Sequence, residues 1–223
     1  AVTLGGNVDI DTTGASAGNI VFSSTIATAG NNLTLDAGTA GNVTLSGNLT
    51  GGGAMTVRDG AVQSYQVLTV DSLDIQDATT SVTLNGALTT DGAVNIDSGG
   101  TIAINAAINT SSSSSGTVDI DGTGTTTIAA AGDINAGGAV AFGANKSGTL
   151  TTSGDIDTSN DNITFTRAVT LGGNVDIDTT GASAGNILFS STIATAGNNL
   201  TLDAGTAGNV TLSGNLTGKG AMT

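Results

Sequence analysis

The residues of this sequence that could do chemistry are almost all aspartates. All 18 acidic residues are Asp, and the sequence contains no His and no Cys. In the stretch 155–161, DIDTSND, the side chains of Asp155, Asp157 and Asp161 could offer carboxylate oxygens to Ca²⁺, which prefers oxygen ligands. The stretch is loosely similar to an acidic calcium-binding loop but lacks the glycine and the distal Glu of such loops. We therefore interpret it first as solvated acidic surface without a cofactor, with calcium as the alternative.

Other aspartates recur at two positions relative to short apolar–polar–apolar stretches. One set follows the second apolar residue: Asp11, Asp36, Asp97, Asp121, Asp178 and Asp203. The other set lies between the two apolar residues: Asp9, Asp74, Asp119 and Asp176. If the stretches stack, like charges come within about 5 Å of each other, which is unfavourable. Such rows either bind Ca²⁺ between them or form an acidic surface that keeps the protein soluble.

Composition argues against most other functions. Without His, Cys or Glu, the usual general bases and activated nucleophiles are missing, and the four cations are scattered along the chain at Arg58, Lys146, Arg167 and Lys219. The sequence therefore predicts no catalytic site and no enzyme. A net charge of −14 disfavours binding to nucleic acid or to an anionic membrane, because both need a basic patch. No apolar run approaches the ~20 residues of a membrane-spanning helix, so we expect no membrane insertion in this segment.

Short β-strands must position these aspartates. Gly, Thr, Asn, Ser, Asp, Val and Ile dominate, strong helix formers are scarce, and apolar and polar residues alternate in runs of three to five. One apolar series recurs every 18 to 25 residues: Val8, Leu33, Met55, Leu73, Val94, Val118 and Val140. A second series lies between its members: Ile20, Val43, Val82, Ile102 and Ile187.

This spacing predicts an all-β fold, a parallel β-helix (β-solenoid) with coils of about 18–25 residues and Val, Ile, Leu and Phe inside. The pattern weakens over 57–72 and 144–162, where it does not fix the register. An antiparallel sandwich is the rival fold, because Asp-Gly or Asn-Gly hairpin signals occur at 59–60, 85–86, 91–92 and 121–122. A sandwich, however, would not repeat one phrase every 20–25 residues.

One block of sequence occurs twice. Residues 168–223 repeat residues 1–56 with two changes, Leu188 in place of Val21 and Lys219 in place of Gly52. We therefore expect 1–223 to be one continuous solenoid, in which 1–167 is a full tandem repeat and 168–223 starts the next. Both copies should adopt the same conformation, since a coil can absorb the two changes. Each repeat should hold seven or eight coils and rise roughly 34–38 Å.

Three other residue types have predicted places in such coils. Asn residues that precede strands, for example Asn19 and Asn42, should hydrogen-bond from coil to coil. Phe22, Phe142, Phe165 and Phe189 occupy the last apolar position of their strands, which favours a buried aromatic stack over a ligand platform. The single tyrosine, Tyr65, is expected at the surface.

Three phrases, GNVTLSGNLTGGGAMTV (41–57), GALTTDGAVNIDSGG (86–100) and GDINAGGAVAFGA (132–144), resemble the repeats of filamentous haemagglutinin-type large exoproteins and related autotransporter passengers. The resemblance extends over essentially the whole chain and involves no catalytic or binding motif. It implies a right-handed parallel β-helix, export from a Gram-negative bacterium, and an adhesive or fibre-forming role at the cell surface.

We conclude from the sequence that the chain is a structural segment of a bacterial cell-surface or extracellular fibre or giant adhesin, a rigid spacer able to self-associate. The expected partners are further copies of the repeat, in the same or neighbouring chains, and cell-surface or matrix components. The alternative is an adhesive module whose acidic rows bind calcium or a partner. An ice-binding solenoid is less favoured, because it needs Thr at two successive outward positions and the first outward row mixes Asp, Thr, Asn and Ala.

Overall fold

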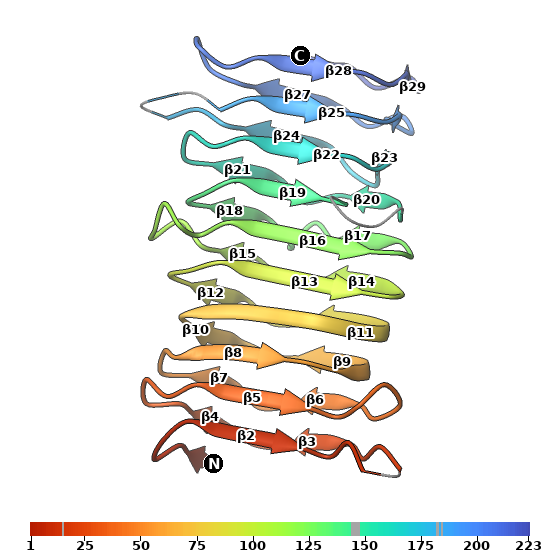
Figure 1. The fold of residues 1–223 in the computed structure, drawn as a ribbon. Helices are drawn as coiled ribbons and strands as arrows, with labels where there is room; N and C mark the ends of the chain where they lie inside the picture. Colours follow the sequence, from red (N-terminus) through yellow and green to blue (C-terminus); the bar gives the residue numbers. More distant parts are fainter. Residues whose placement is uncertain (15, 144–147, 182, 184) are drawn as a thin grey trace.

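The chain folds into a stack of three-sided coils built from β-strands that are joined by turns (Figure 1). The computed structural model describes residues 1–14, 16–143, 148–181, 183 and 185–223. Successive strands lie on three faces, which we call A, B and C, and the chain visits them in that order. Within the described ranges, no helix is long and apolar enough to cross a membrane.

Face A is a ten-stranded sheet in which every neighbouring pair is parallel. Its strands, in order along the axis, are β1 (Val2–Thr3), β4 (Ile26–Ala27), β7 (Leu49–Thr50), β10 (Leu68–Val70), β12 (Leu88–Thr90), β15 (Ile108–Asn109), β18 (Ile134–Ala136), β21 (Ile156–Thr158), β24 (Val175–Asp178) and β27 (Leu200–Asp203).

Faces B and C are joined through one long strand, β11 (Ser72–Leu84), whose first half pairs on face B and whose second half pairs on face C. The other strands of face B are β2 (Val8–Asp11), β5 (Leu33–Asp36), β8 (Ala54–Val57), β13 (Val94–Ser98), β16 (Val118–Gly122), β19 (Val140–Phe142), β22 (Ile163–Phe165), β25 (Ile187–Phe189) and β28 (Val210–Leu212). Those of face C are β3 (Ile20–Phe22), β6 (Val43–Leu45), β9 (Gly60–Tyr65), β14 (Thr101–Ile104), β17 (Thr126–Ile128), β20 (Leu150–Thr152), β23 (Val169–Leu171), β26 (Ile193–Ala194) and β29 (Leu216–Thr217).

The pairing register confirms the predicted solenoid. The first apolar series, Val8 to Val140, forms one inward column of face B in which each member pairs with the next. Because all pairings between the described strands are parallel, the antiparallel sandwich is wrong. The hairpin signals at 59–60, 85–86 and 91–92 lie at corners between faces, whereas the signal at 121–122 lies at the end of a paired strand of face B. The second apolar series is correct for Ile20, Val43, Val82 and Ile102 on face C but wrong for Ile187, which pairs with Ile163 on face B.

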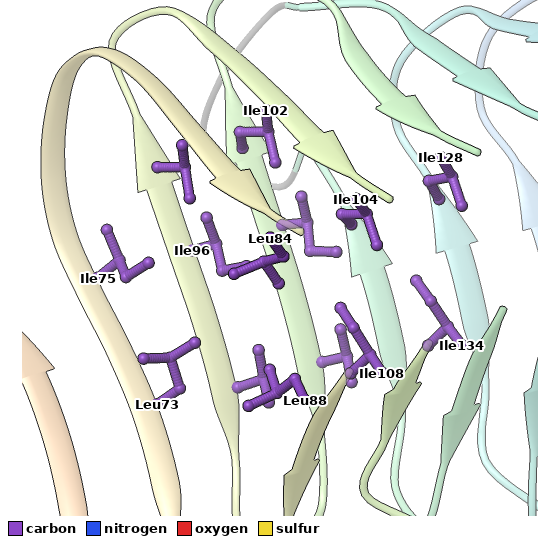
Figure 2. Packing of buried hydrophobic residues seen from close by; sticks show 14 of the residues in the cluster. Leu73, Ile75, Leu84, Leu88, Ile96, Ile102, Ile104, Ile108, Ile128 and Ile134 are labelled. Atoms are coloured by element: carbon purple, nitrogen blue, oxygen red, sulfur yellow. The ribbon is translucent and has the colours of Figure 1, made fainter. Parts of the chain in front are cut away.

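The core is the interior of the stack, where inward side chains of all three faces meet (Figure 2). Leu73 and Ile96 of face B, Ile104 of face C and Leu88 of face A are each at most 1% exposed. Strict alternation of apolar and polar residues produces this arrangement, since successive side chains of a strand point to opposite sides. Every coil therefore adds a layer of aliphatic side chains and removes it from water.

Aromatic residues confirm one prediction and correct another. The rings of Phe142, Phe165 and Phe189 stack along face B, with centroids 5.2 and 4.3 Å apart. Phe22 is not part of this stack; it pairs with Leu45 on face C and is only partly buried. The expectation for Tyr65 was wrong, because its side chain is fully buried. Its hydroxyl can be buried because it donates a 2.7 Å hydrogen bond to Oε1 of the buried Gln63.

Asparagine side chains link successive coils, as the sequence predicts. Asn19 Oδ1 accepts a hydrogen bond from the backbone N–H of Asn42, at 2.9 Å, and Asn42 Oδ1 accepts one from Val62, at 3.1 Å. Farther along, the side-chain amides of Asn186 and Asn209 also donate to the Oδ1 atom one coil below, at 3.1 Å. These ladders satisfy corner N–H groups that the strand pairing leaves free.

The two copies of the repeated block pair with the same internal register. Val8 pairs with Leu33 and Val175 with Leu200, their equivalents 167 residues later. A local difference occurs at one of the two substitutions: Gly52 has a φ of 74°, whereas Lys219 is not among the described non-glycine residues with positive φ. A lysine has a Cβ that disfavours this region, so the corner adopts another path.

The two copies nevertheless lie on different faces. Strand β2 of the first copy belongs to face B, whereas its equivalent β24 belongs to face A. Strand β4 belongs to face A, and its equivalent β26 to face C. The second copy is therefore shifted by one face relative to the first.

Candidate functional site

The structure places the three predicted metal ligands at one corner of the stack and on face A. Asp155 directly precedes β21, and Asp157 is the outward residue in the middle of that strand. Asp161 lies in the turn that follows, where its backbone carbonyl accepts a 2.6 Å hydrogen bond from the Thr158 hydroxyl. The structure thus brings Asp155 and Asp157 into one surface region, while Asp161 is not among the carboxylates that act electrostatically on Asp157.

Two adjacent acidic columns form this region, which we call the junction patch. One column contains Asp157, Asp178 and Asp203, which pair in register on successive strands of face A. The other contains Asp133, Asp155 and Asp176. In the second column, the carboxylate of Asp133 accepts the backbone N–H of Asp155, at 3.0 Å, and that of Asp155 accepts the N–H of Asp176, at 2.7 Å. These carboxylates therefore accept hydrogen bonds from backbone N–H groups of the next coil, as asparagine side chains do in the ladders.

Partial burial and nearby negative charges in the junction patch raise the pKa of Asp157. Partial burial, followed by the charges of Asp178, Asp155, Asp176 and Asp133, raises the pKa of Asp157 to about 6. Partial burial and the neighbouring carboxylates also raise the pKa of Asp176. The patch therefore carries a full set of negative charges only above about pH 6.

The surface beside the patch is hollowed but open. A hollow of about 520 Å³ is lined by polar residues of four successive coils on face A and by Ala136: Asn109, Ser111, Asn135, Asp157, Thr158, Ser159, Asp178 and Thr180. Among the described residues, no three or more acidic side chains are grouped closely enough to hold a metal ion. The carboxylates are spread along the axis at the spacing of the coils, about 4.8 Å.

Sequence reasoning missed that two of the scattered cations pair with aspartates about two coils away. Arg167 Nη2 lies 3.5 Å from Asp121 Oδ1, and these side chains are only 1% and 4% exposed. Arg167 Nη1 also donates to the Thr126 hydroxyl, at 3.0 Å. Arg58 and Asp9 form an exposed pair at 3.1 Å. The separations of 46 and 49 residues were the only available signal, and they become meaningful once the coil length is known. Lys146 lies outside the described residues.

The three faces differ in the charge of their central outward column. On face B the column includes three aspartates of the predicted row, Asp9, Asp74 and Asp119. The fourth, Asp176, lies on face A instead. On face A it changes from Thr and Asn to Asp at Asp157. On face C it contains no charged residue in the described chain: Val21, Thr44, Ser64, Thr83, Ala103, Thr127, Thr151, Thr170, Ala194 and Thr217.

We expect the junction patch to make stability fall with rising pH. The pKa of Asp157 in the folded protein, about 6, lies above the ordinary value of 3.8, so the folded state retains this proton longer than the unfolded state. Its unfavourable contribution is absent below about pH 4 and complete above about pH 6. Asp157→Asn should therefore raise the free energy of unfolding by about 1 kcal/mol near pH 7, after allowance for solvent screening at this half-exposed site.

Denaturant unfolding at several pH values measures this effect. The variant and the wild type should be equally stable near pH 4 and diverge between about pH 4 and 6. Asp161→Asn is the control, because Asp161 does not act on Asp157, and it should leave the pH dependence unchanged. A variant that gains no stability near pH 7 would contradict the electrostatic account of the patch.

Comparison of the chain with protein-family models, with characterised proteins and with solved structures gives no match.

Proposed function

We propose that this chain is a structural segment of an extracellular bacterial fibre or giant adhesin, in which it acts as a rigid repetitive spacer. The observation that supports the proposal most strongly is the uninterrupted axial pairing, which connects β1 to β27 on face A and β2 to β28 on face B. In a solenoid each coil contacts only its neighbours, so added coils add length without requiring a new core.

Several features of the coils favour a load-bearing role over a binding pocket. The hydrogen bonds between paired strands, the aliphatic core and the asparagine ladders all run along the axis, so each coil is tied to the next by backbone, side-chain and packing contacts. The surface hollow beside the junction patch is open and polar. A groove that recognises a ligand would need exposed aromatic or convergent polar groups, and the four phenylalanines and Tyr65 lie inside or partly inside the core.

The location at the cell surface is proposed from the resemblance of the sequence phrases to haemagglutinin-type exoprotein repeats. Antibodies raised against the 223-residue chain test it on intact cells that make the protein. We expect labelling of material that projects from the cell and that added protease removes. Labelling only after the cells are permeabilised would contradict an extracellular role and leave the solenoid fold unaffected.

A second candidate function is binding of calcium or a cationic partner by the junction patch, favoured by the raised pKa of Asp157 among four carboxylates. The two functions differ in thermal unfolding. A ligand that binds only the folded state raises the unfolding midpoint. For a spacer with a solvated acidic surface, we expect millimolar calcium to change the midpoint no more than the same ionic strength of sodium chloride.

A further inference from the structure

The two copies of the repeated block have the same sequence and pairing but different surroundings. Phe22 and Phe189 are equivalent residues, yet Phe22 pairs with Leu45 only, whereas Phe189 lies on Phe165 of the preceding coil in the aromatic stack. Likewise Asp11 pairs with Asp36 on face B, while their equivalents Asp178 and Asp203 continue the column of Asp157 on face A. The neighbours change because the second copy begins one face earlier in the coil.

The number of strands in a repeat produces this shift. From β2 to β24 the strand number advances by 22, and β11 fills a position on two faces, so the chain advances by 23 positions. Three positions complete one coil, so the repeat contains 23 divided by three, or seven and two-thirds coils. The sequence repeat and the coil are therefore out of step by one-third of a coil.

The junction between the copies accommodates this shift without a break in the pairing. On face A, β21 from the end of the first repeat pairs with β24 from the second, and on face B, β22 pairs with β25. On face C, β20 pairs with β23. At the last coil, apolar residues that are buried in the first copy become exposed: Val210 is 43% exposed, whereas its equivalent Val43 is fully buried. Val43 is covered by the following coil, in which it pairs with Gln63, whereas Val210 lies in the last coil of the 223 residues.

We infer that each further copy of this sequence docks on the end of the solenoid one face out of step with the copy before it. Successive repeats are then related by a rise of about 37 Å and a rotation of one-third of a turn. The arrangement returns to its starting face after three repeats, which is three times 167 or 501 residues. These 23 coils span about 110 Å.

This geometry has a consequence for the surface of a long array. The junction patch combines Asp133, Asp155 and Asp157 from the end of one repeat with Asp176, Asp178 and Asp203 from the start of the next. Each junction would create one such patch, and successive patches would lie on successive faces. The uncharged outward column of face C would move by one face per repeat in the same way. A lateral partner could then contact an uncharged column on any of the three faces of the array. The occurrence of such arrays rests on the proposed spacer function, whereas the rotation rests on the junction alone.

Engineered disulfides test the rotation within the chain, which has no cysteine of its own. Paired residues on neighbouring strands lie about 4.8 Å apart, within the range that a disulfide spans. The variant Asp157→Cys/Asp178→Cys should form a cross-link, because these residues pair on face A. The variant Thr166→Cys/Asp178→Cys should not. Thr166 follows β22 on face B, where residue 178 would lie if the second copy restarted on the face of the first.

The variant Thr34→Cys/Thr56→Cys, which pairs on face B within the first copy, is the positive control. A cross-link at 166/178, or none at 157/178 while the control pair cross-links, would overturn the inference. Neither result would bear on where the protein is located or what it supports, so failure of the rotation and failure of the proposed function are distinguishable.

Discussion

Asp121→Asn should destabilise the protein by about 3–5 kcal/mol, although the change removes only one charge. The carboxylate of Asp121 lies 3.5 Å from Nη2 of Arg167, and both side chains are almost completely buried. Burial lowers the pKa of Arg167, while the charges of Asp121 and Asp119 raise it. The guanidinium stays charged, so these carboxylates offset part of the cost of burying that charge inside the stack. Without the charge of Asp121, the buried guanidinium at the corner of faces B and C loses the carboxylate with which it forms an ion pair.

The exposed pair formed by Arg58 and Asp9 provides the matched control. Its side chains are 46% and 52% exposed, so water screens the interaction. Asp9→Asn should cost less than about 1 kcal/mol. Both variants are measured by chemical denaturation against the wild type. Equal effects of the two substitutions would contradict the distinction between a buried and a solvated ion pair.

Phe165→Ala should cost about 3–5 kcal/mol, because it removes the middle ring of the aromatic stack and leaves a cavity between two coils. Phe165 is fully buried, and its ring stacks on Phe142 on one side and on Phe189 on the other. The surrounding backbone is fixed by parallel pairing on both sides of β22, so it cannot collapse to fill the space.

Phe22→Ala is the control, because Phe22 is a phenylalanine of a neighbouring face that lies outside the stack. Phe22 is only partly buried and belongs to the first complete coil, so its loss should cost about 1–2 kcal/mol. The free energies of unfolding of both variants test the idea that burial in the stack sets the contribution of each ring. A larger effect at Phe22 than at Phe165 would refute it.

The sequence was sufficient to predict the coils, but it did not predict on which face each strand of the second copy lies. Alternation identified the inward residues, and the spacing of Val8, Leu33 and Met55 gave the register directly. Ile187 was misplaced because its local sequence is that of Ile20, and local sequence does not reveal how many strand positions precede a residue. Only a complete count, including the two faces occupied by β11, shows that the repeat is not a whole number of coils.

The local sequence pattern also did not predict which polar side chains are buried. Tyr65 is buried because Gln63, two residues earlier, also faces the interior and accepts its hydroxyl. Local sequence grouped Asp155, Asp157 and Asp161 as candidate metal ligands, and the structure places Asp155 and Asp157 in the junction patch. The other residues that crowd Asp157 come from neighbouring coils, with Asp178 the first among them. Contacts of this kind depend on the coil length rather than on sequence proximity.

If the repeat adds length to a rigid rod, solution X-ray scattering will show it when this chain is compared with versions extended by one and two further 167-residue repeats. We expect a constant cross-section and an increase in length of about 37 Å per added repeat, from seven and two-thirds coils at ~4.8 Å each. Particles that instead grow in all dimensions, with a radius of gyration that follows the scaling of compact domains, would contradict it.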